Sequence, residues 1–572
     1  MGFSSMNTIT GAIAATMVAA CLTAGLMTLM QLSSAALPVV FVVVLAAVAW
    51  GLGRLDFDWR QPKLEAWEKA LIGFAAAVAL LRLAPYAYQY LAGVLVAPIT
   101  WDDNWHFQEV ASLVNAERYP PRLNFNPDSY FHFYYVPWVP AAALASLLQS
   151  LTGLAMIKLA YALGALGLCL AIAWGLIVAI RHLVPRDGRR WTMAALLIAG
   201  AAVDGLFAIR HFVALGHPMH AEWWQNGLLI ANSFSALSSS LIWVPHHMMG
   251  AMAVLLALVV ATEPMTLALK WGRAPFVLAG LLMAVAAFSS VFAFIGGVLA
   301  LLPLIWELLR SKDKSRLGWL VLGFVVPALP LAYIYLGSEA RGGVVIGQAF
   351  EAWSHQTGKP VMGLVGVVIA FVLMMLEVGW LFLIGKGLDR GEEDGARLRS
   401  VAVVAMLVLA STAVIGFSGS NNWALRATIV PVVLLAIYVG RGFAAGTGGG
   451  ARLDRAVISK AGIAALGLAG VAHLNEVTLL IGASARSPAF AAETATCKAD
   501  IMKYNQTYKR EDRAAGSIEA SLAGCRNELS PYHVERPFTK ASISVVDREL
   551  MGRGFGFLGS GFLGGAGNPS PK

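Results

Sequence analysis

The feature that most constrains the fold is a series of long apolar runs, which recur from Thr8 to Ala483. Several exceed roughly 18 residues, which is enough to cross about 30 Å of hydrocarbon. In lipid such runs must be helical, because every backbone amide needs an internal partner. Charged residues make up 13% of the chain and the mean hydropathy is +0.67, whereas a soluble domain carries about 25% charged residues. We therefore predict an all-α, polytopic membrane protein.

The charge of the connections between the runs predicts their sidedness. Basic connections stay in the cytoplasm, and here they are residues 181–190, 270–273, 310–316, 386–399 and 441–460. The connections between them then face outward, at residues 210–240, 337–359 and 418–426, as does the tail. These basic loops account for the net charge of +9, so we expect no nucleic-acid partner.

The front of the chain needs one adjustment to fit this scheme. Three spans place residues 88–130 outside, and a full crossing by residues 131–153 would leave the arginines of 181–190 outside as well. We therefore predict that 131–153, with its Tyr, Trp and Pro residues, is an interfacial helix. This gives about 13 crossings of an inner (plasma) membrane. The amino terminus is then cytoplasmic and the carboxyl terminus extracytoplasmic.

Two domains follow from the composition. Residues 1–484 form the transmembrane domain, with 88–153 as its helical first extracytoplasmic loop, and residues 485–572 form a small extracytoplasmic segment. We expect the last 20 or so residues, which are rich in Gly, to be disordered. Cys497 and Cys525 lie in this segment. Because the extracytoplasmic side is oxidising, we predict that they form a disulfide.

An acidic pair, Asp102 and Asp103, lies in the first outer loop. Adjacent carboxylates repel each other, which can prepare one of them as a base or a metal ligand. An equally simple interpretation is a solvated pair that caps a helix over residues 105–115. The same loop contributes three further polar candidates for lining a site, which are His106, Asp128 and His132.

Other polar residues map to the outer side. Nine of the eleven histidines do so, which indicates a site there, although no zinc signature is present. His246 and His247 lie where an outer loop re-enters the membrane, which favours a lining role. Asp204 lies near the outer end of its span, where it either serves a site or pairs with Arg210.

Arg426 ends the outer loop of residues 418–426. A fixed guanidinium at the interface matches a lipid-linked phosphate bidentately. The alternative is an anchor to lipid head groups.

One long stretch, residues 275–310, exceeds the length of a single span. The Ser289-Ser290 pair at its middle predicts a tight helical hairpin that turns at the outer face.

The first outer loop resembles that of the GT-C superfamily of polyprenyl-phosphate-sugar glycosyltransferases. The resemblance rests on the acidic pair, the predicted short helix 105–115, the basic and Pro-containing stretch 118–122 and the interfacial helix. It covers about residues 70–440 as architecture and 102–132 as motif, although three spans, not one, precede the loop here. It implies that Asp102 or Asp103 is catalytic and that Arg426, helped by Arg210, binds the donor phosphate.

The resemblance implies an inverting transfer of sugar from a polyprenyl-phosphate donor to a lipid, glycan or protein acceptor at the extracytoplasmic face. No cofactor is required, and a divalent metal at Asp102 and Asp103 is compatible with the mechanism. Two alternatives stay open. One is an oligosaccharide polymerase or ligase that uses a pyrophosphate-linked donor, and the other is a lipid-glycan flippase or transporter without enzymatic activity.

Overall fold

The structure is a computed structural model. It describes residues 5–54, 63–92, 101–123, 126–130, 134–153, 156–216, 234–262, 273–311, 313–336, 344–389, 393–417, 423–445, 460–482 and 484. The predicted tail, with Cys497 and Cys525, lies outside these residues, as does His132.

Nearly all of the described chain is helical. The first half holds α1 (Ser5–Leu29), the 3-10 turn η1 (Ser34–Ala36), α2 (Leu37–Arg54), α3 (Ala66–Ala92), α4 (Trp101–Val114), the 3-10 turn η2 (Val136–Trp138), α5 (Val139–Thr152), α6 (Ile157–Leu183), α7 (Arg186–Ile198), α8 (Ala202–Leu215), α9 (Leu237–Ile242) and α10 (Pro245–Thr262).

The second half holds α12 (Ala274–Ser289), α13 (Val291–Ala300), α14 (Leu302–Arg310), α15 (Ser315–Leu331), α16 (Tyr333–Leu336), α17 (Gln348–Thr357), α18 (Pro360–Met374), α19 (Trp380–Leu388), α20 (Glu393–Ser411), α21 (Ile429–Ala444) and a last helix, Lys460–Gly482. Two short π-helical segments, η4 (Met375–Gly379) and η5 (Trp423–Ala427), interrupt the α-helical runs.

The strands form two small antiparallel pairs. β1 (Arg122–Leu123) pairs with β2 (Asn126–Tyr130), and β3 (Val344–Ile346) pairs with β4 (Ile415–Phe417), with Val345 opposite Gly416. These short strands are minor elements of a helical protein, so the prediction of an almost all-α fold is confirmed.

Eight helices within the described residues are long and apolar enough to cross a membrane, and the number rises to ten if each of two bent pairs counts as one span. Three shorter apolar helices accompany them, at residues 136–152, 274–289 and 315–331. A multi-pass membrane protein is thus supported, while the count of 13 crossings and the orientation of the termini stay predictions.

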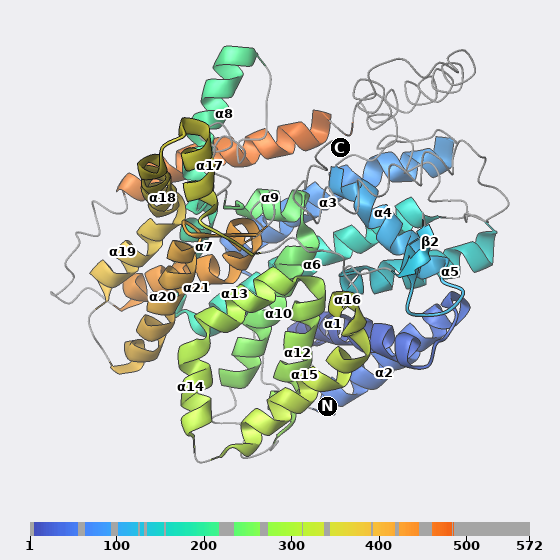
Figure 1. Cartoon of the computed structure of the whole chain (residues 1–572). Helices are drawn as coiled ribbons and strands as arrows, with labels where there is room; N and C mark the ends of the chain where they lie inside the picture. The colour runs from blue at the N-terminus through green and yellow to red at the C-terminus, as the bar shows by residue number, and fades with distance from the viewer. Residues whose placement is uncertain are drawn as a thin grey trace, which may run out of the picture.

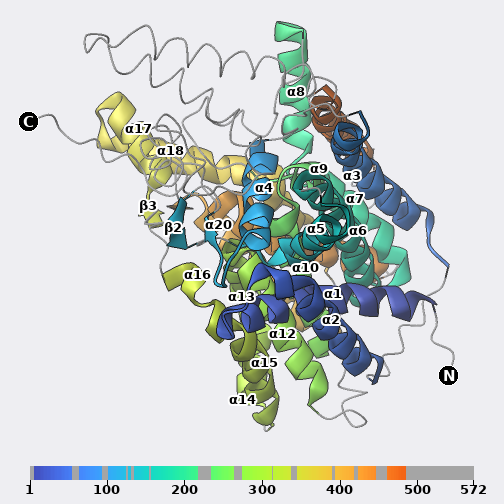
Figure 2. The same ribbon diagram turned by 90° about the vertical axis from the view of Figure 1, so that its right-hand side faces the viewer.

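The helices are arranged around a central group. α10 packs against α6, α12 and α13, and α21 packs against α7, α19 and α20. Figure 1 shows α4 and α5 on one side of this group and α18, α19 and α20 on the other, and Figures 1 and 2 both show α8 projecting from the body. One continuous hydrophobic core extends across the central helices.

The first outer loop differs in detail from the sequence-based prediction. α4 begins at Trp101, so the acidic pair lies inside its first turn and does not precede the helix. Carboxylates in a first turn interact favourably with the helix dipole. α5 has 14 residues and is about 21 Å long, which is shorter than the hydrocarbon layer. Its interfacial placement stays a prediction that this length supports.

The helix is interrupted at the serine pair, as a turn there requires, while the hairpin and its position at the outer face stay predictions. α12 ends at Ser289, and Ser290 caps the amino terminus of α13, where its hydroxyl oxygen accepts a hydrogen bond from the Ala293 amide. This break matters for the site, because Ser290 also bonds to a histidine of α10.

Candidate functional site

One face of α4 carries the acidic and histidine residues of the candidate site. Asp103, His106 and Glu109 recur at spacings of three residues, which places them along one side of the helix. All three are buried, at 0%, 2% and 0% exposure. Burying ionisable groups is costly, so each of these residues calls for partners or for a role that explains its position. We name these residues and their neighbours, described below, the α4 cluster.

Asp103 is held by α3 and α6. The Tyr86 hydroxyl donates to Oδ2 at 2.9 Å, and the Tyr161 hydroxyl donates to Oδ1 at 2.5 Å. Arg82 Nε lies 3.3 Å from Oδ1, and the same guanidinium donates through Nη2 to the Ile242 carbonyl in α9. Asp103 therefore ties α4 directly to α3 and α6, and Arg82 extends the network to α9; the Asp103 side chain points into the protein, away from bulk solvent.

His106 and Glu109 form a second pair on α4. His106 Nδ1 lies 2.7 Å from Glu109 Oε2. Because an ionised carboxylate can only accept hydrogen bonds, Nδ1 carries the ring proton in this pair, and Nε2 keeps its lone pair. Burial lowers the pKa of His106 well below its usual value, and the positive charges of Arg82 and Arg426 lower it further. His106 is thus neutral at neutral pH.

The first turn of α10 brings two more histidines to the cluster. The ring of His246 lies 4.6 Å from the ring of His106 and 3.9 Å from that of His247. His247 Nδ1 lies 2.8 Å from the Ser290 hydroxyl. Both histidines are buried. Segments about 140 residues apart in the sequence therefore meet here, as the outer-side mapping of the histidines predicts.

Aromatic residues surround these imidazoles. The Trp138 ring lies 4.7 Å from that of His106, and the Tyr134 ring lies 5.7 Å from that of His247. Lys158 is fully buried nearby, with Nζ 6.0 Å from the Phe107 ring. The cluster is consequently packed and fixes the orientation of its rings.

Arg426 reaches the cluster from η5. Gly296 of α13 allows this approach, because a Cβ atom there would lie 1.8 Å from the Ala427 carbonyl oxygen. The half-buried Arg426 interacts electrostatically with His106, His246 and His247. Its charge also opposes the rise that burial causes in the pKa of Tyr134. The predicted proximity of Arg426 to the acidic loop is therefore present, while its role stays a prediction.

The remaining predicted residues lie on α8 or have side chains outside the described set. Asp204 is buried in the first turn of α8, whereas Arg210 is exposed further along that helix. The side chains of Asp102 and of Asp128, which lies in β2, are outside the described set. The predicted roles of these residues stay predictions.

The participants that the sequence analysis missed include Arg82, Glu109, Lys158 and Tyr161. Arg82 and Lys158 had a visible signal, since each is a cation inside or beside an apolar run. Glu109 follows His106 by three residues, a helical spacing that sequence reasoning can test. Tyr161 carries no such signal.

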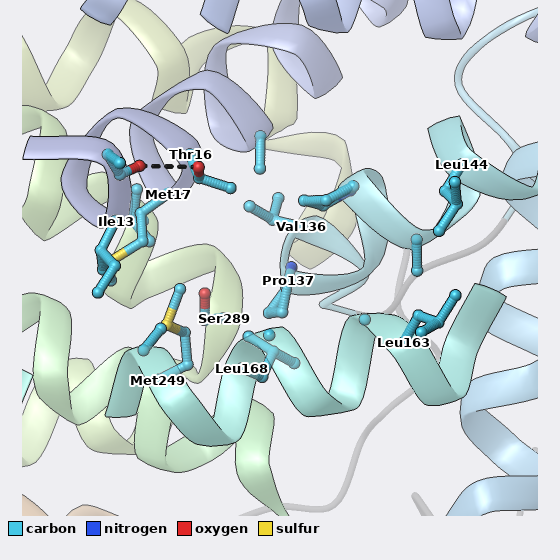
Figure 3. Close-up of a pocket in the computed structure, with 18 of the residues that line it drawn as sticks. Ile13, Thr16, Met17, Val136, Pro137, Leu144, Leu163, Leu168, Met249 and Ser289 are labelled. Carbon is cyan, nitrogen blue, oxygen red and sulfur yellow. Dashed lines mark hydrogen bonds between the residues drawn. The ribbon is translucent and has the colours of Figure 1, made fainter. Parts of the chain in front are cut away.

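An apolar groove of about 430 Å³ lies beside the cluster. Its walls come from α1, η2, α5, α6, α10 and α12, and Figure 3 shows Ser289 among otherwise mostly apolar side chains. The Ser289 hydroxyl is buried without a hydrogen-bond partner. The volume lies within the roughly 300–1,000 Å³ of ligand pockets.

The groove and the cluster share their walls. Pro137 lines the groove while the adjacent Trp138 packs on His106. Ser289 lines the groove while the adjacent Ser290 bonds to His247, and Met249 follows two residues after that histidine. An apolar surface and a polar, ionisable one thus lie back to back on η2, α10 and the α12–α13 break.

Among the described residues, no three His, Cys, Asp or Glu side chains meet in a way that would hold a metal ion. Comparisons with protein-family models, curated proteins and solved structures gave no match for this chain. The function must therefore be argued from the cluster and the groove themselves.

Proposed function

We propose that this protein is a membrane glycosyltransferase that takes a sugar from a polyprenyl-phosphate donor at the extracytoplasmic face and transfers it to a lipid, glycan or protein acceptor. The observation that carries the proposal is the shared wall between the apolar groove and the α4 cluster. A ligand with a hydrocarbon chain and a charged, hydrophilic head matches that pair of surfaces. A lipid-linked sugar has both parts.

The charges of the α4 cluster suit a phosphate head. Arg82, Lys158 and Arg426 are basic side chains and Asp103 and Glu109 are acidic ones, so the basic groups of the cluster outnumber its carboxyl groups by one. Arg426 offers donors in a fixed fork that fits phosphate oxygens. We assign it the role of stabilising the departing phosphate, where charge develops in the transition state.

The proposed reaction is a single displacement at the anomeric carbon. The acceptor oxygen forms the new glycosidic bond as the bond from the anomeric carbon to the phosphate oxygen breaks, and the phosphate leaves with the electron pair. The acceptor hydroxyl gives its proton to a base on α4. Asp103, whose two oxygens already accept hydrogen bonds from tyrosines, is assigned as a positioning residue that fixes α4.

The test uses purified full-length protein in liposomes with a panel of radiolabelled polyprenyl-phosphate hexoses and pentoses. The acceptor source is a lipid and glycan extract of cells that express the protein. We expect label to move from one donor into the extract, with release of polyprenyl phosphate, and we expect Arg426→Gln to weaken donor use. A wild-type protein that neither binds nor consumes any of these donors would contradict the proposal.

A carrier for a lipid-linked glycan is the second candidate. The specific observation in its favour is the set of interrupted helices. Two pairs bend, by 41° for α7 with α8 and by 59° for α13 with α14, and buried Glu377 lies in the π-helical segment η4. Interrupted helices at the midplane are typical of transporters. In the liposome assay a carrier would move the donor across the bilayer intact, with no release of polyprenyl phosphate.

A further inference from the structure

The identity of the base can be taken further, and three side chains on α4 compete for the role. A base needs an unused lone pair at a place that the acceptor hydroxyl can reach. The sequence favours Asp102 or Asp103. The structure distinguishes Asp103 from His106 by what each side chain already bonds.

Asp103 has little capacity left for an acceptor hydroxyl. Its Oδ1 receives the Tyr161 hydroxyl and faces Arg82, and its Oδ2 receives the Tyr86 hydroxyl. An acceptor would have to displace one of these partners, and a buried tyrosine hydroxyl would then lose its hydrogen bond to Asp103, which is unfavourable.

His106 has the opposite arrangement. Glu109 occupies Nδ1 at 2.7 Å, while Nε2 is buried and has no hydrogen-bond partner within the described part of the chain. An unsatisfied buried nitrogen in a native structure calls for an explanation. A substrate hydroxyl that donates to Nε2 supplies one.

The surroundings of His106 also suit proton transfer. The rings of Trp138 and His246, at 4.7 and 4.6 Å, hold the imidazole in place. Glu109 fixes the tautomer and stabilises the imidazolium once the proton arrives, as the carboxylate does in a Ser-His-Asp triad. The neutral state of His106, which follows from the lowering of its pKa by burial, Arg82 and Arg426, is the state that accepts a proton.

We propose that His106 is the catalytic base of the transfer and that Glu109 is its positioning residue. The assignment rests on the proposed function. In the step, Nε2 takes the proton of the acceptor hydroxyl while the acceptor oxygen bonds to the anomeric carbon and the phosphate departs with the electron pair. The imidazolium then gives its proton to solvent.

The experiment compares turnover of the wild-type protein, His106→Gln and Glu109→Gln in the liposome assay. Gln at position 106 keeps a hydrogen-bonding group for Glu109 but accepts no proton, so kcat should fall by about 10²- to 10⁴-fold with the donor KM within about threefold. Glu109→Gln should reduce kcat by at least about tenfold. His355→Gln, at an exposed position on α17, is the control and should behave as wild type.

The pH profile separates proton transfer from a structural role. Several titratable or charged groups surround His106 from the packed elements, namely Arg82, Asp103, Glu109, Tyr134, Lys158, Tyr161, His246, His247 and Arg426. The acid limb of kcat should lie below pH 6.5, and removal of the Glu109 charge should move it to lower pH. Exogenous imidazole should restore part of the activity of His106→Gly.

Each outcome decides between the two proposals. A wild-type protein without transfer removes both the proposed function and this assignment. An active wild type with His106→Gln turning over within threefold of it removes the assignment alone, and so does an acid limb that Glu109→Gln leaves in place. Loss of turnover in Asp102→Asn with normal turnover in His106→Gln would return the role to the acidic pair.

Discussion

Helices α3 and α6 are held together at one end by a direct ion pair and at the other end through Asp103 of α4, and the two ends differ in how completely their polar groups are satisfied. At one end, Glu68 forms a bidentate pair with Arg181. At the other end lies the α4 cluster, where Arg82 and Tyr161 hold Asp103. Tyr161 and Arg181 are 20 residues apart on α6, which is about 30 Å along a helix. The two clusters thus lie at opposite ends of one span.

The Glu68 end is a closed network. Glu68 Oε2 also accepts from the Glu65 amide at 2.7 Å, and Arg189 donates to the Arg181 carbonyl at 3.0 Å. In contrast, ring nitrogens of His106, His246 and His247 in the α4 cluster have no hydrogen-bond partner among the described residues. A closed network of buried charges holds helices together, whereas a buried polar network with unmet hydrogen bonds keeps donors and acceptors that a ligand can use.

The largest expected effect is on stability, and it follows from removing the Glu68 charge from its network. Glu68→Gln leaves Arg181 buried without its counter-charge, so the free energy of unfolding should fall by about 3–5 kcal/mol. Turnover per folded molecule should stay at the wild-type value, because this end is far from the α4 cluster. Thermal unfolding in detergent, followed by activity of the folded fraction, measures both quantities.

The matched control is the double variant Glu68→Met with Arg181→Met. Replacing both partners by apolar groups removes the unpaired charge, and most of the lost stability should return. A single variant as stable as wild type would show that this pair does not hold α3 and α6 together.

Arg426→Gln should have the next largest effect and should act on binding. Loss of a charged donor to a phosphate corresponds to about 1.5–3 kcal/mol, or roughly a 10- to 150-fold weaker affinity for polyprenyl phosphate. Stability should change little, because the side chain is only half-buried. Binding is measured by titration of the purified protein with polyprenyl phosphate.

Arg310→Gln is the control for loss of one positive charge. Arg310 ends α14 and lies over the Trp306 ring, on the side of the chain that the charge pattern places in the cytoplasm. Its variant should bind polyprenyl phosphate as wild type does. Equal losses in both variants would mean that Arg426 contributes only general surface charge.

The sequence predicts some parts of this comparison and not others, for physical reasons. Apolar length predicts the helices, and the serine pair predicts the break at Ser290, because both depend on local chemistry. The outer-side mapping predicts that His246 and Arg426 lie near the loop with Asp103. The sequence could not show that the oxygens of Asp103 already accept hydrogen bonds. Its partner Tyr161 is 58 residues away, and only the packing of α4 on α6 brings the two together.

His246→Phe tests whether the unmet hydrogen bonds have a function. Neither ring nitrogen of His246 has a partner, so an apolar ring of similar shape should leave the free energy of unfolding unchanged or raise it by up to about 2 kcal/mol. Turnover should fall, because a residue that serves a ligand often contributes to activity while it lowers the stability of the fold. Denaturation curves and the liposome assay provide the two measurements.

Trp243→Phe is the matched aromatic control. The Trp243 indole N–H donates to Glu476 Oε2 at 2.9 Å, so its removal breaks a satisfied bond and should lower stability by about 1–3 kcal/mol. His246→Phe should therefore leave the free energy of unfolding unchanged or raise it, whereas Trp243→Phe should lower it. A large loss of stability in His246→Phe would place that histidine with the structural groups.

The smallest expected effect is a dependence of stability on pH that comes from His106. Its folded pKa lies below the unfolded value of 6.5, so the unfolded chain binds the proton first as the pH falls. This contribution to stability is complete above about pH 6.5 and is lost as the pH falls below it, with a slope of at most about 1.4 kcal/mol per pH unit for one proton. The free energies of unfolding of the wild type and of His106→Gln, measured between pH 7.5 and 5, should therefore converge at the acid end. The values for His355→Gln should follow those of the wild type. Glu68→Gln leaves His106 and its neighbours in place, so it should lower the whole curve without removing this acid slope. If His106→Gln keeps the full wild-type slope, His106 is not held neutral by the fold, and the contrast between the closed and the open end loses its electrostatic basis.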